Sequence, residues 1–180
     1  MVARIARSGD TARVAYELYL IPVPAGADLE ERGEALLARL ARGHERTALS
    51  EHGREWACAL AQRLAEEDPE LAQVPVAALA GSVELHTRTG IQVALAEHFV
   101  RFLLPFSHFG GAAETAFREL FALAAVAAQC SGWHAYDPQE GAAIALDEGS
   151  SLEALEIYLS VMDQLRPEPA APGGGTAAPS

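Results

Sequence analysis

The sequence predicts an α+β protein, a two-layer sandwich in which helices pack on an antiparallel or mixed sheet of about five strands. Half of the 180 residues are hydrophobic and 21% are charged, which suits one domain with its own core. Strand-like segments follow one another closely between residues 82 and 106, and helical patterns stand before and after them. The expected order of elements is therefore β-α-α-β-β-β-α-β-α.

The composition along the chain divides it into three regions. Residues 1–13 have no regular pattern and are expected to be a disordered leader that arose at the start of the gene, with the native start near Val14. Residues 14–165 carry all the strand and helix patterns and form the single predicted domain. Residues 166–180 are mostly Pro, Ala, Gly and Ser, so we expect a disordered tail.

The first strand is expected at residues 14–22. Tyr16, Leu18 and Leu20 alternate with their neighbours there, and Pro22 cannot donate a hydrogen bond to a strand ladder. The strand should therefore end at that proline.

Two helices should follow the first strand. Asp28 and Glu31 have the spacing of a capping box, in which each side chain accepts a backbone N–H of the first turn, and Gly43 is placed to end this helix. The second helix is expected to begin near Ser50 and to run to about Glu67. The Pro-interrupted residues 68–80 are expected to form an irregular connection.

A meander of three strands is expected next, at residues 82–87, 91–95 and 99–106. The first two alternate apolar and polar residues, and short turns join all three. The third segment is apolar on both faces, which predicts a strand in the centre of the sheet.

The two remaining helices are expected at residues 112–130 and from Ser150 to about Leu165. The first is apolar almost all round in its second half, which predicts deep burial. The second begins with a capping-box pattern, and its Leu152, Leu155, Leu159 and Met162 repeat at helical spacing. We expect this stripe to pack on the sheet; the alternative is a homodimer that pairs through residues 152–165.

The charge of the chain limits its partners. The net charge is −12, the pI is about 4.8, and every positive residue is an arginine. An acidic surface repels the phosphates of nucleic acids and anionic lipids and favours a basic protein surface. We therefore expect a protein partner, no nucleic acid and no membrane. No secretory signal pattern is visible, so a cytoplasmic location is expected.

Histidine and cysteine spacing does not predict a metal or a disulfide framework. No pair of histidines stands four residues apart on one helix, and no Cys-x-x-Cys motif occurs. Cys58 and Cys130 lie in apolar helical contexts and are expected to be buried. We therefore expect no cofactor and no metal.

The segment GWHAYDPQEG, residues 132–141, holds most of the candidate site residues. On a strand, Asp137 faces one side and His134 and Tyr136 the other, and the following Pro and Gly are typical of a turn. The structural interpretation is an aromatic strand that ends in a turn. The functional interpretation places Asp137 and Gln139 at the mouth of a cleft beside His134 and Tyr136.

Two further histidines are possible neighbours of this segment. His86 and His134 both lie on predicted strands and could meet on one face of the sheet. His108 follows the last strand of the meander. A carboxylate and an imidazole in contact could perform acid–base chemistry, which is the basis of the enzyme alternative.

Four short motifs resemble those of a group of small bacterial proteins that has no established activity. The resemblance covers about residues 14–160 and rests on Tyr16-Glu17-Leu18-Tyr19, Thr89-Gly90-Ile91-Gln92-Val93, Pro105-Phe106-Ser107-His108 and Tyr136-Asp137-Pro138-Gln139. This chain departs from the group at Glu17, where Asp is expected, and at Phe106, where Tyr is common. Some similar small proteins look like partners or immunity factors of secreted toxins, which is what the resemblance implies about function.

Three functions are therefore carried forward. The first is a non-catalytic protein-binding module, immunity-like or regulatory, whose candidate binding residues are His134, Tyr136, Asp137, Gln139, His86 and His108. The second is a small hydrolase that uses Asp137 and a histidine. The third is a homodimeric scaffold.

Overall fold

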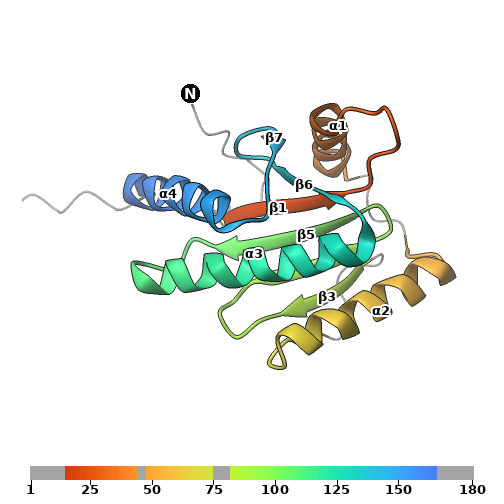
Figure 1. The fold of residues 1–180 in the computed structure, drawn as a ribbon, viewed down its shortest axis with the longest axis horizontal. Helices are drawn as coiled ribbons and strands as arrows, with labels where there is room; N and C mark the ends of the chain where they lie inside the picture. Colours follow the sequence, from red (N-terminus) through yellow and green to blue (C-terminus); the bar gives the residue numbers. More distant parts are fainter. Residues whose placement is uncertain (1–14, 44–47, 75–81, 166–180) are drawn as a thin grey trace, which may run out of the picture.

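The computed structural model describes residues 15–43, 48–74 and 82–165, and the expected leader and tail lie outside them. Seven strands form one sheet in the order β2-β3-β4-β5-β1-β6-β7, and every neighbouring pair is antiparallel. The strands are β1 (Ala15–Ile21), β2 (Ala72–Val74), β3 (Ser82–His86), β4 (Gln92–Ala96), β5 (Phe99–Pro105), β6 (His134–Asp137) and β7 (Ala142–Ala143). The helices are α1 (Leu29–Ala41), α2 (Glu51–Glu67), α3 (Gly111–Ser131) and α4 (Glu148–Leu165). The α+β class and the antiparallel sheet are confirmed (Figure 1).

The expected meander is present as β3, β4 and β5, and β5 lies at the centre of the sheet as predicted. Two short strands were not expected. The sequence indicated an irregular connection where β2 forms, and no element at residues 142–143, where β7 forms directly after the expected turn. A strand of two or three residues is too short to show a recognisable alternation of apolar and polar residues. Whether it forms depends on the neighbouring strand with which it pairs.

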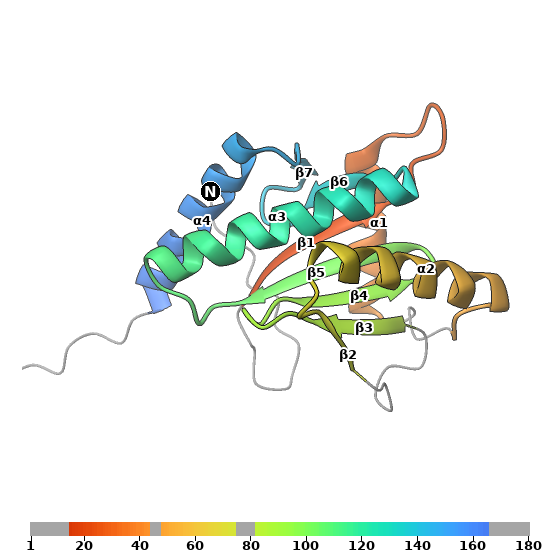
Figure 2. The same ribbon diagram turned by 60° about the horizontal axis from the view of Figure 1, so that its bottom comes forward.

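The sheet carries helices on both faces (Figure 2). The main core lies between α2, α3 and α4 and the sheet residues Leu18, Phe102 and Val93. A second, smaller cluster lies between α1 and the opposite face, where Tyr19, Phe99 and Tyr136 pack with leucines of the helix. Alternate residues of β1 therefore enter different cores, which is why the strand is buried almost throughout.

The start of α4 differs from the expected one. The helix begins at Glu148, and Asp147 Oδ1 accepts the Ser150 N–H at 2.8 Å, so the cap lies before Ser150. The buried face of α4 is formed by Ala154, Tyr158 and Met162. Leu152 was expected to be buried but is 50% exposed, because the helix is rotated so that Tyr158 faces Phe117.

The prediction that both cysteines are buried is wrong, since Cys58 and Cys130 are both exposed. Each lies on a helix next to apolar residues, but the core-facing positions are taken by larger neighbours. On α2 these are Leu60 and Leu64, and on α3 they include Leu123. The apolar residues next to each cysteine in the sequence therefore did not predict whether the cysteine lies on the buried or the exposed face of its helix.

The β4–β5 turn holds the start of α2 through Glu97. Its Oε1 accepts the Ser50 hydroxyl at 2.7 Å and its Oε2 accepts the Ser50 N–H at 3.0 Å. Ser50 Oγ in turn accepts the Gly53 N–H at 2.9 Å. These hydrogen bonds lower the pKa of the Glu97 carboxyl, with the Ser50 hydroxyl as the largest cause.

Replacing Glu97 with glutamine should loosen the first turn of α2. A carboxyl whose pKa is lowered on folding stabilises the fold above its unfolded pKa, and this contribution is lost as the pH falls through its folded pKa. Wild type and Glu97→Gln should therefore differ in hydrogen exchange of the Gly53 amide at neutral pH and converge in acid. Glu55→Gln, on the exposed surface of the same helix, is the control. Equal exchange in all three proteins at neutral pH would contradict this role of Glu97.

Candidate functional site

Asp137 lies at the end of β6, where only 1% of its surface is exposed. Its Oδ2 accepts the Tyr16 hydroxyl at 2.7 Å, and its Oδ1 accepts the Gln139 N–H at 2.7 Å. Oδ1 also lies 3.4 Å from the Glu140 N–H. Asp137 thereby connects β1 to the turn that follows β6, and both of its oxygens are engaged.

Gln139 completes this connection. With its amide oriented so that the nitrogen faces the two acceptors, it donates to Asp137 Oδ1 at 3.0 Å and to the Glu17 carbonyl at 2.9 Å. The turn after β6 is therefore held to β1 by side chains from both segments. This arrangement is a structural connection, in agreement with the first of the two interpretations of residues 132–141.

Burial and hydrogen bonding act in opposite directions on Asp137. Burial raises the pKa of its carboxyl, and the hydrogen bonds from Tyr16, Gln139 and Glu140 lower it, with burial the larger effect. Burial and the neighbouring Asp137 carboxylate raise the pKa of the Tyr16 hydroxyl far above its ordinary value. Tyr16 is therefore a permanent hydrogen-bond donor at physiological pH.

Tyr136, the residue before Asp137, lies on the opposite face of the sheet. Tyr136 is 1% exposed and packs against α1 at Gly33, where a Cβ atom would lie 2.5 Å from its ring. Burial raises the pKa of its hydroxyl. His134, at the start of β6, is exposed. The structure thus does not bring Asp137, Tyr136 and His134 together around one cleft.

The expected meeting of His86 and His134 does not occur. His86 ends β3 and His134 begins β6, and β4, β5 and β1 lie between these strands. The four strand spacings alone amount to about 19 Å, and the register adds four residues along β1 between Glu17 and Ile21. His108 lies elsewhere, near the β3–β4 turn at Gly90, and its N–H donates to the Tyr158 hydroxyl at 3.1 Å. No group of three His, Cys, Asp or Glu residues in the described part of the chain could hold a metal ion.

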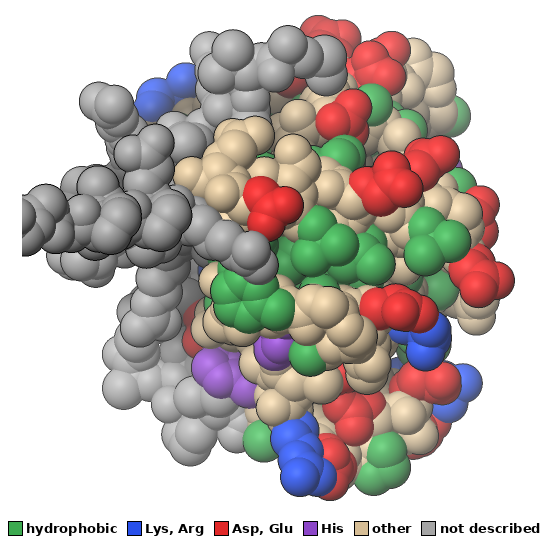
Figure 3. Space-filling view, turned by 90° about the vertical axis from the view of Figure 1, so that its left-hand side faces the viewer, with side chains coloured by type: hydrophobic (Ala, Val, Ile, Leu, Met, Phe, Trp, Pro, Cys, Tyr) green, Lys and Arg blue, Asp and Glu red, His purple; other side chains and the backbone are tan. Residues whose placement is uncertain are grey.

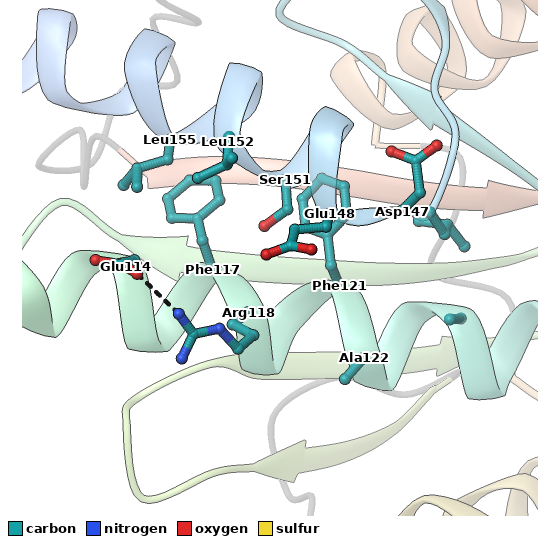
Figure 4. A pocket seen from close by; sticks show the side chains of 12 residues that line it. Glu114, Phe117, Arg118, Phe121, Ala122, Asp147, Glu148, Ser151, Leu152 and Leu155 are labelled. Atoms are coloured by element: carbon teal, nitrogen blue, oxygen red, sulfur yellow. Dashed lines mark hydrogen bonds and ion pairs between the residues drawn. The ribbon is translucent and has the colours of Figure 1, made fainter.

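An apolar groove of about 390 Å³ lies between α3 and α4 (Figure 4). We call it the α3–α4 groove. Phe117 and Phe121 point from α3 toward α4, and Leu152 and Leu155 point from α4 toward α3. The full lining is Glu114, Phe117, Arg118, Phe121, Ala122, Ala125, Leu146, Asp147, Glu148, Ser151, Leu152 and Leu155.

Charged residues border the α3–α4 groove. Glu114 pairs with Arg118 at 2.8 Å along α3, whereas Asp147 and Glu148 lie at the start of α4. Figure 3 views the end of the molecule where α3 begins and α4 ends, and it shows hydrophobic side chains gathered between acidic ones. The groove therefore has a mostly apolar lining, of which Leu152 is the exposed large side chain, and carboxylates at its margin.

No family model, curated protein or solved structure gives a significant match to the chain. No helix in the residues that the structure describes combines the length and the apolar character needed to cross a bilayer.

The groove was missed at the sequence level, although one signal pointed to it. The stripe of Leu152, Leu155, Leu159 and Met162 is that signal: pairing through residues 152–165 is the alternative to its packing on the sheet, and Leu152 is exposed. The other wall is formed by α3, and its contribution depends on how the two helices pack.

Proposed function

We propose that the protein is a non-catalytic protein-binding module, immunity-like or regulatory, which binds a basic partner through the α3–α4 groove. The observation that carries this proposal is the exposure of Leu152, which is half accessible at the edge of an apolar groove. Large apolar side chains at the edge of a groove are typical of protein interfaces, where their burial supplies the binding energy.

The arrangement of the polar candidates supports binding over catalysis. A general base needs an oxygen or nitrogen within reach of a substrate proton. Asp137 uses both oxygens for internal hydrogen bonds and is buried, and His134 and His86 are several strands apart. The residues of segment 132–141 therefore serve the fold in this proposal, and the groove serves the partner.

The charge of the surface supports a basic partner. The chain has a net charge of −12, and two of the carboxylates lie together at one end of the groove, at Asp147 and Glu148. Complementary charges speed association and select among partners. The same charge disfavours nucleic acids and anionic membranes.

Capture from the source cell tests this proposal. The bait is the full chain in three forms: wild type, Leu152→Glu in the groove, and Ala59→Glu on the exposed surface of α2. We expect one stoichiometric partner with wild type and Ala59→Glu, and a loss of about tenfold or more with Leu152→Glu, because a buried charge opposes an apolar contact. Thermal melts of the three proteins show that each is folded. Equal capture by all three, or no partner at all, would contradict the proposal.

A further inference from the structure

We infer that the partner binds as a single basic, amphipathic α-helix that lies lengthwise in the α3–α4 groove. This inference rests on the proposed function and deepens it, because it specifies the chemistry of the occupant. The argument uses the length of the groove, the nature of its walls and the position of its charges.

The length of the groove fits a short helix. Its lining on α3 runs from Glu114 to Ala125, and α4 contributes Leu152 and Leu155 one turn apart. At about 1.5 Å per residue, this stretch of α3 is about 16 Å long, which corresponds to three turns of a partner helix. Three turns present three or four apolar side chains on one face, enough to cover the exposed Leu152, the half-buried Leu155 and the exposed Ala122.

The walls of the groove favour a helix over an extended peptide. Both walls are helices, α3 and α4, whose backbone N–H and C=O groups bond within each helix. An extended peptide would therefore find no strand edge to pair with, and its own backbone groups would lose water without a replacement. In a helical peptide, most backbone N–H and C=O groups are already hydrogen-bonded to each other. The small side chains of Ala122 and Ala125 let its backbone approach α3 closely.

The charges of the groove require positive residues on the partner. The lining holds three carboxylates and one guanidinium, and Glu114 pairs with that guanidinium on Arg118. Asp147 is engaged by the N–H of Ser150, which lowers the pKa of its carboxyl. Among the residues that the structure describes, the Glu148 carboxylate has neither a hydrogen bond nor an ion pair. Arg or Lys near the start of α4 would pair with it.

The same charges disfavour a second copy of this chain as the occupant. Two chains of net charge −12 repel each other, and two symmetry-related grooves would bring Asp147 and Glu148 of each copy toward an equally acidic surface. A basic helix meets no such repulsion. Its apolar residues can face the groove while its charged residues lie at the margin of the same short segment.

Selection from a peptide library tests the inference. A displayed library of random peptides about 16 residues long, enough for three turns and both flanks, is selected on the full wild-type chain. Bound pools are then divided by whether they also bind Leu152→Glu or Ala59→Glu. Some pools should bind Ala59→Glu but not Leu152→Glu. We expect the peptides in these pools to carry a net positive charge and to have apolar residues spaced three and four apart. Glu148→Arg should weaken these peptides about tenfold.

Each other outcome contradicts a different part of the account. If the groove-dependent pools are acidic, or alternate with the period of a strand, the helix inference is wrong and the binding function stands. If no pool distinguishes wild type from Leu152→Glu, the α3–α4 groove is not a binding surface and both proposals fail. If sedimentation shows a dimer that Leu152→Glu converts to a monomer, the occupant is a second copy and the inference is overturned.

Discussion

Replacing Asp137 with alanine is expected to lower the free energy of unfolding by about 3 kcal/mol. The substitution removes the acceptor of the Tyr16 hydroxyl and leaves that hydroxyl buried without its partner. It also frees the N–H of Gln139, so the turn after β6 loses its attachment. Chemical denaturation of wild type and variant measures the difference.

Two further variants separate the causes of this loss. Tyr16→Phe removes only the hydroxyl and should cost about 1–2 kcal/mol. Asp137→Asn keeps an acceptor for the turn and should cost less than Asp137→Ala. In a double-mutant cycle, Tyr16 and Asp137 should show a coupling of about 1 kcal/mol or more, because they share one buried contact. A loss within about 0.5 kcal/mol for Asp137→Ala, the range of surface substitutions, would contradict the structural role.

The pH dependence of these variants has a definite sign. Burial raises the folded-state pKa of Asp137 above its unfolded value, so the native protein binds the proton more tightly. Its contribution to stability is therefore most favourable in acid and decreases as the pH rises through the folded pKa. The free energy of unfolding of wild type, relative to that of Asp137→Asn, should decline as the pH rises from the unfolded-state pKa of Asp137 through its folded-state pKa. A relative stability that rises with pH there would mean that the hydrogen bonds to the carboxylate outweigh its burial.

Gly33→Ala is expected to destabilise the protein by about 1–3 kcal/mol, although alanine is the better helix former. A Cβ atom at residue 33 would lie 2.5 Å from ring carbons of Tyr136, which is too close. Tyr136 is buried between α1 and β1, so its ring has little room to move. Helix α1 should therefore separate from the sheet.

Denaturation of a matched pair of variants measures this effect. Gly111→Ala places the same methyl group at the start of α3, where nothing lies within 4 Å of the new atom. This control should be neutral or slightly stabilising. In a Tyr136→Leu background the smaller side chain leaves room for the new methyl group. Gly33→Ala should therefore cost less stability in that background than in wild type. A Gly33→Ala protein as stable as wild type would show that α1 packs farther from β6.

The features that the sequence predicts well are those with local causes. Ser50 and Asp28 both cap helices where expected, because a capping side chain acts on amides two or three residues away. The central position of β5 follows from its apolar residues on both faces. Asp137-Pro138 and the following residues form the expected turn for the same local reason.

The features that it misses depend on residues far apart in the chain. Tyr16 and Asp137 are 121 residues apart, and no pattern around either one indicates their hydrogen bond. The separation of His86 from His134 follows from strand order, because β1 enters the sheet between β5 and β6. The α3–α4 groove arises where two helix surfaces meet, so neither helix sequence contains it alone.

The central claim, that a protein partner occupies the α3–α4 groove, is tested most directly by site-specific photo-crosslinking in the source cell. A photoreactive phenylalanine analogue is placed at residue 152 in one full chain and at residue 134, which is also exposed, in another. The account predicts one crosslinked partner from residue 152 and none from residue 134. A crosslink from residue 134 alone would contradict it and would return the binding surface to the segment that follows α3.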